Sequence, residues 1–100
     1  MTPEGRVKKK VDAVLKHYGR DVYYIKPVPY GHGKSTVDYL VCVRGFFLAI
    51  ETKGTPDGRP TARQEGTLED ITDAGGATLV VADDAGVEHL RCWMEDRCGK

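Results

Sequence analysis

Two β-forming segments that lie only two residues apart constrain the fold more than any other feature. Residues 37–43 and 46–51 are rich in β-branched and aromatic side chains, and Arg44-Gly45 between them leaves room only for a tight turn. The segments are therefore predicted to pair as an antiparallel β-hairpin. A hairpin alone is not stable in water, so this one needs further strands or a helix to cover it.

The length of the turn fixes which side chains share one face of the hairpin. If Val43 pairs with Phe46, continuing the same register places Asp38 opposite Glu51. Two facing carboxylates repel each other unless one takes a proton or a cation lies between them. A three-residue turn would instead set Asp38 opposite Thr52, which would weaken this prediction.

A divalent cation is one solution to the repulsion between these acids. Carboxylate oxygens without a neighbouring cysteine or histidine suit Mg²⁺ or Mn²⁺ better than zinc or copper. Lys53 follows Glu51 by two residues, so its ammonium group emerges on the same face and can stabilise charge on a phosphoryl oxygen. The alternative is that Asp38 ends a strand in solvent while Glu51 and Lys53 form a surface ion pair.

The remaining segments predict one α/β domain, residues 1–100, in which helices flank a mixed β-sheet in the order α-β-β-β-α-β-α. Turn-forming residues at 19, 27–34, 54–60 and 75–76 separate the elements. Besides the hairpin, we expect a helix at about 3–18, a strand at 21–28, a helix at 61–74, a strand at 77–82 and a helix at 87–94 capped from Asp84.

Glu4 and Gln64 are ambiguous from local pattern alone. Glu4 precedes Val7 by three residues and so is predicted on the inward apolar stripe of the first helix, although an acid near a helix start is also favoured by the helix dipole. Gln64 follows Thr61 with capping-box spacing, which accounts for it without any further role.

The distribution of charge permits a basic face. The chain is neutral overall, but residues 1–50 hold 9 Lys/Arg and 4 Asp/Glu (+5), whereas residues 51–100 hold 6 and 11 (−5). Four cations lie close together on the first helix: Arg6, Lys8, Lys9 and Lys10. On charge alone, the favoured interpretation is a neutral protein with solvated charges, although a local basic face could attract a phosphate backbone. No apolar stretch suggests a membrane span or a secretory signal, so we expect an intracellular protein without membrane contact.

Residues 31–36, Gly-His-Gly-Lys-Ser-Thr, resemble the end of a phosphate-binding P-loop. The motif requires an earlier glycine where this chain has Val28, and it requires a helix where residues 37–43 predict a strand. We therefore expect no nucleotide cofactor. Lys34 and Ser35 remain candidate contacts to phosphate groups.

The ordered pattern of these residues resembles the PD-(D/E)XK nucleases and, more narrowly, a VRR-NUC domain. The resemblance covers about residues 3–83 and includes a helical acid near the start, Asp38 after a glycine-containing loop, the sequence Glu51-Thr52-Lys53, and a helix that opens with Thr61 to Gln64. It implies a restriction-endonuclease-like core. Val37 precedes Asp38 at the position where the PD-(D/E)XK motif has a proline. These nucleases often lack that proline.

The resemblance also implies roles for the site residues. Asp38, Glu51 and the carbonyl of Thr52 would bind Mg²⁺ or Mn²⁺, and Lys53 would position or activate the water that hydrolyses a DNA phosphodiester. Glu4 and Gln64 would be further members of the catalytic site. The basic face of the first helix, Arg6, Lys8, Lys9 and Lys10, would be the patch that contacts the DNA backbone.

Stand-alone VRR-NUC domains are typically phage or bacterial proteins. Similar ones act as homodimers on branched DNA such as Holliday junctions, which implies a DNA endonuclease in the cytoplasm of a bacterium or a phage-infected cell. An isologous dimer would supply the two symmetric cuts that a junction needs. Two alternatives are a nuclease for flaps or single-stranded ends and a non-catalytic DNA-binding module with a nuclease fold.

Overall fold

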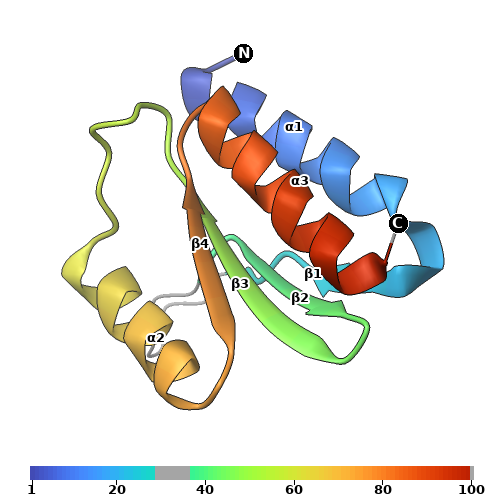
Figure 1. The fold of residues 1–100 in the computed structure, drawn as a ribbon. Helices are drawn as coiled ribbons and strands as arrows, with labels where there is room; N and C mark the ends of the chain where they lie inside the picture. The colour runs from blue at the N-terminus through green and yellow to red at the C-terminus, as the bar shows by residue number, and fades with distance from the viewer. Residues whose placement is uncertain (29–36, 100) are drawn as a thin grey trace.

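A four-stranded mixed sheet forms the centre of the computed structural model, which describes residues 1–28 and 37–99 (Figure 1). The strands lie in the order β1-β2-β3-β4, with β1–β2 and β2–β3 antiparallel and β3–β4 parallel. Their bounds are β1 Val22–Ile25, β2 Tyr39–Val43, β3 Phe46–Thr52 and β4 Ala77–Val81. The predicted α/β class with a mixed sheet is confirmed.

The turn between β2 and β3 has the predicted two-residue form. Arg44 and Gly45 both adopt positive φ angles, 51° and 91°, as a type I′ hairpin turn requires. Val43 pairs with Phe46, and the register continues to Tyr39 opposite Ile50. The hairpin register predicted from the length of the turn is therefore confirmed.

Two helices, α1 (Pro3–His17) and α3 (Asp84–Cys98), lie side by side across one face of the sheet (Figure 1). The apolar stripe of α1 is buried with that of α3 against alternate residues of β2 and β3. The residues at the centre of this core are Val11, Leu15, Tyr39, Val41, Leu48, Ile50, Leu90 and Met94.

The third helix, α2 (Ala62–Asp73), connects β3 to β4 and lies beside β4 (Figure 1). None of its residues is buried, so it contributes little to the core. A parallel strand pair requires such a crossover connection. The first part of this connection, residues 53–61, leaves the sheet at the end of β3 where the predicted site lies.

Three expected elements differ clearly from their predicted bounds. The strand expected at 37–43 begins only at Tyr39, so Asp38 directly precedes β2. The strand expected at 21–28 is only β1, since Asp21 belongs to a short 3₁₀ turn, Gly19–Asp21, and the strand ends at Ile25. The last helix begins earlier than expected, because Asp83 rather than Asp84 is its N-cap and accepts a hydrogen bond from Gly86 N at 2.8 Å.

No helix in the part of the chain that the structure describes is both long and apolar enough to cross a bilayer. Cys42 and Cys92 are exposed free thiols. The P-loop-like segment at residues 31–36, with Lys34 and Ser35, lies outside the described residues.

Candidate active site

The open end of the β2–β3 hairpin brings Asp38 and Glu51 together. Asp38 N donates a hydrogen bond to Glu51 Oε1 at 3.2 Å. Thr52 donates twice to Asp38 Oδ2, from its backbone N at 2.8 Å and from Oγ1 at 2.7 Å. These hydrogen bonds therefore orient both carboxylates at the end of the hairpin.

The two acids differ in their electrostatic surroundings. Glu51 is only 1% exposed, and burial together with the charge of Asp38 raises its pKa to about 7, although Lys53 opposes the rise. Burial alone would raise the pKa of Asp38 as well, but the hydrogen bonds from Thr52 outweigh it and lower that pKa below its ordinary value. At neutral pH Asp38 is ionised, whereas Glu51 is close to its midpoint.

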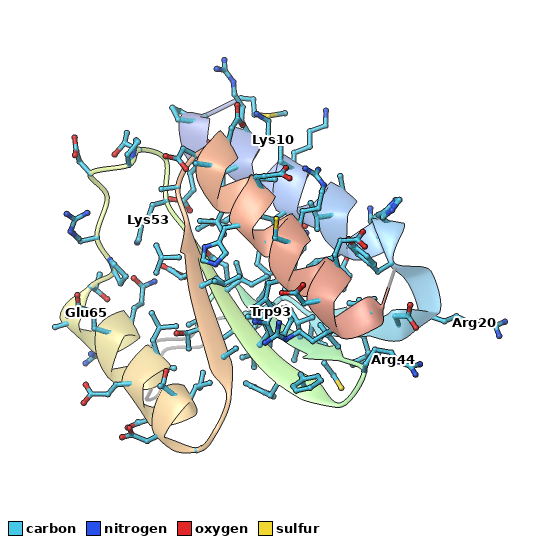
Figure 2. The ribbon with its side chains drawn as sticks, viewed as in Figure 1. Lys10, Arg20, Arg44, Lys53, Glu65 and Trp93 are labelled. Carbon is cyan, nitrogen blue, oxygen red and sulfur yellow. The ribbon has the colours of Figure 1, made fainter. Side chains whose placement is uncertain are left out.

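Lys53 joins the site from the residue after β3. Its backbone N donates to Val81 O at 2.9 Å, which extends the parallel pairing past Thr52 and fixes where the side chain emerges. Lys53 Nζ lies 3.2 Å from Glu51 Oε2 and 3.3 Å from Gln64 Oε1. Figure 2 shows Lys53 on the side of the sheet that faces the segment leading to α2.

Gln64 both caps α2 and contacts the site. The capping box with Thr61 is present, because Thr61 Oγ1 accepts from Gln64 N at 3.2 Å and Gln64 Oε1 accepts from Thr61 N at 3.0 Å. The same Oε1 atom accepts the hydrogen bond from Lys53. The two interpretations of Gln64 that the sequence left open are therefore compatible.

Glu4 reaches the site through Lys8 rather than directly. Lys8 Nζ lies 3.2 Å from Glu4 Oε2 and 3.6 Å from Asp38 Oδ1. The Glu4 side chain is 42% exposed, so its predicted place on the inward stripe is wrong, although it does lie beside the site. At Gly54 a Cβ atom would come within 3.1 Å of Glu4 N, so a glycine there allows the chain leaving β3 to pass close to the start of α1.

The predicted basic patch is divided by the fold. Lys8 belongs to the site, and Lys10 forms an ion pair with Asp84 of α3. Arg6 and Lys9 are exposed on α1 and remain available to solvent. Lys8 was predicted as an exposed contact to phosphate, and its place beside Asp38 was not predicted. The only local signal of that place in the sequence was the i,i+4 spacing of Lys8 from Glu4.

The donor chemistry of this site fits a hard divalent cation. Within residues 1–28 and 37–99 there is no cluster of three His, Cys, Asp or Glu side chains that could hold a metal ion. The predicted set instead consists of two carboxylates and one backbone carbonyl, and oxygen ligands of this kind suit Mg²⁺ or Mn²⁺. The raised pKa of the buried Glu51 carboxyl also indicates a position where added positive charge would be stabilising.

Comparison with known proteins gives one informative match. No protein-family model matches the chain, and no curated protein matches it. A solved structure described as a VRR_NUC domain superposes with a TM-score of 0.77 and 26% sequence identity, and the match covers 90% of this chain and 95% of that one. The fold class and the family resemblance predicted from the sequence are both confirmed by this likeness.

Proposed function

We propose that the chain is a VRR-NUC domain of the PD-(D/E)XK nuclease superfamily and that it is a metal-dependent DNA endonuclease with a preference for branched DNA. The observation that carries the proposal is the arrangement of Asp38, Glu51 and Lys53. Two carboxylates and an ammonium group converge at the end of one hairpin, and the backbone N of Asp38 donates a hydrogen bond to the Glu51 carboxylate.

Asp38, Glu51 and the Thr52 carbonyl would hold a Mg²⁺ or Mn²⁺ ion. A bound divalent ion supplies Lewis-acid stabilisation of a phosphoryl oxygen and makes water a better nucleophile. Thr52 contributes to this role through its hydroxyl and backbone N, which orient Asp38 and keep it ionised.

Lys53 would act on the reacting groups directly. Its side chain is only 18% exposed, and its ammonium group is oriented by Glu51 and Gln64. A fixed ammonium group there can hold a water for attack on phosphorus and stabilise the negative charge that develops on the phosphoryl oxygens. Water adds to phosphorus as the bond to one bridging oxygen breaks, which leaves one phosphomonoester end and one hydroxyl end.

Arg6 and Lys9 on α1 would contact the DNA backbone close to the site, since they lie on the same helix as Glu4 and Lys8. On the evidence of the sequence, Lys34 and Ser35 are further proposed DNA contacts.

Two-fold symmetric cutting of a junction requires two active sites, so a homodimer of this small domain is part of the proposal. Exposed apolar residues on the sheet face opposite α1 and α3, Tyr23, Ile25 and Phe47, offer a surface for such a contact.

The activity is tested by incubating the purified chain with linear duplex, flap, single-stranded and four-way-junction DNA in Mg²⁺ or in EDTA. We expect Mg²⁺-dependent cuts, placed symmetrically on the junction, and loss of cutting in Glu51→Ala and Lys53→Ala. Glu69→Gln, on an exposed glutamate of α2, is the matched control and should cut normally. Full cleavage by folded Glu51→Ala and Lys53→Ala proteins would reject the site, and cuts confined to flaps or single strands would reject the preference for four-way junctions.

The dimer is tested by measuring the mass of the protein in solution with and without junction DNA. We expect about twice the monomer mass of 11.0 kDa. A monomer at working concentrations in both conditions would reject the dimer but not the nuclease activity.

A further inference from the structure

Lys8 lies between two carboxylates of the candidate site. Its Nζ atom is 3.2 Å from Glu4 Oε2 and 3.6 Å from Asp38 Oδ1. The other oxygen of Asp38 accepts both hydrogen bonds from Thr52, so Oδ1 is the oxygen that faces Lys8. A positive charge of the chain itself therefore joins the acid on α1 to the acid on the hairpin.

The fold sets this position of Lys8. Glu4 and Lys8 are four residues apart on α1, so they share one face of the helix. Tyr39, which is 1% exposed, shares the single proton of its hydroxyl between Asp12 Oδ1 at 2.7 Å and Lys8 O at 3.2 Å. Because Tyr39 directly follows Asp38, the backbone of Lys8 is tied to β2 beside the acid that its side chain meets.

We propose that Lys8 takes the place of a second divalent ion, so that each site binds one divalent ion, through Asp38 and Glu51, and not two. The inference rests on the proposed function, since it presupposes that Asp38 and Glu51 bind a divalent ion. Two-metal sites hold their ions about 3.5–4 Å apart and need carboxylates for both. Glu4 is the additional carboxylate beside Asp38, and its oxygen is already paired with the Lys8 ammonium group.

The charge of Lys8 opposes a second ion and can replace part of its effect. An ammonium group within about 4 Å of both acids repels a further divalent cation that approaches the same oxygens. The same group can stabilise negative charge on a phosphate placed at the site. The Lys8 side chain is 42% exposed, so it lies at the surface of the site and not in the core.

The test is the number of Mn²⁺ ions bound per chain, measured by titrating the full-length protein and following free Mn²⁺ by electron paramagnetic resonance. We expect one ion for the wild type and for Lys8→Arg, which keeps the charge. We expect two for Lys8→Met, and one again when Glu4→Gln is added to Lys8→Met. Lys9→Met removes a charge from the neighbouring exposed position of α1 and is the matched control, with one ion expected.

Two ions bound per chain of the wild type would overturn the inference. One ion bound per chain of Lys8→Met would also overturn it, provided that the circular dichroism spectrum shows the variant to be folded like the wild type. If Lys8→Met does not fold, Lys8→Gln is judged by the same criterion. The proposed function itself would be rejected by a different result. That result is a wild type that binds no Mn²⁺, or that binds Mn²⁺ equally well when Glu51→Gln is introduced. The two failures are therefore distinguishable without measuring cleavage.

Discussion

Replacing Glu51 with glutamine should stabilise the protein at alkaline pH much more than at acidic pH. Burial beside Asp38 raises the pKa of Glu51 from 4.5 to about 7 in the folded protein. The folded state thus holds this proton more tightly than the unfolded state, so stability falls as the pH rises from 4.5 to 7. Glutamine has no proton to lose, and the variant avoids this loss.

The magnitude follows from the size of the pKa change. One pKa unit corresponds to about 1.4 kcal/mol, so a rise from 4.5 to about 7 destabilises the ionised, metal-free protein by about 3 kcal/mol. Most of this, about 2.5 kcal/mol, develops between pH 5 and pH 8.5. Glutamine can still accept the hydrogen bond from Asp38 N, so the variant keeps that contact of the hairpin end.

The assay is urea unfolding of both proteins in EDTA at pH 5 and pH 8.5, followed by circular dichroism. The free energy of unfolding of Glu51→Gln relative to wild type should rise by about 2.5 kcal/mol between the two pH values. Glu69→Gln, at an exposed position, should change by less than about 0.5 kcal/mol. Added Mg²⁺ at pH 8.5 should stabilise the wild type more than the variant. A difference between variant and wild type that is the same at both pH values would refute the reasoning.

Three further substitutions test the contacts around the site. Tyr39→Phe removes a buried hydroxyl bonded to Asp12 and should lower the free energy of unfolding by about 1–2 kcal/mol in urea; a loss below about 0.3 kcal/mol would contradict this. Thr52→Val keeps the side-chain shape but removes the hydroxyl donor to Asp38, so cleavage should fall about 10-fold or more at wild-type circular dichroism, and an unchanged rate would reject the orienting role. Thr61→Ala removes the N-cap of α2 and should cost about 1 kcal/mol in urea unfolding, whereas unaltered stability would mean that the cap is energetically neutral.

The hairpin could be predicted because its determinants are local. A two-residue turn with positive φ at Arg44 and Gly45 fixes the register, and the alternation of side chains then assigns each residue to a face. Asp38 and Glu51 follow from that register without any knowledge of the rest of the fold. The acid pair was therefore the most predictable part of the site.

The start of α3 was harder to predict because no residue of the helix before Val87 is buried. The buried stripe begins only at Val87, although the helix starts at Asp84. Asp83 and Asp84 are both acceptable N-caps by residue type, and the hydrogen bond from Gly86 N decides between them.

The role of Lys8 could not be predicted from local pattern, because it depends on how α1 docks on the sheet. The i,i+4 spacing from Glu4 is visible in the sequence, but such pairs are common on exposed helix faces. The contact with Asp38 joins residues that are 30 positions apart, so only the tertiary packing reveals it.

The hydroxyl of Tyr39 also helps to fix the position of α1 along the sheet. Sliding α1 by one residue would shift its backbone by about 1.5 Å, and sliding it by one turn would shift it by about 5.4 Å. Either displacement would break the hydrogen bond between Tyr39 and Lys8 O. The separation of Glu4 from Asp38 therefore depends on this contact, and not on how many residues connect the helix to the hairpin.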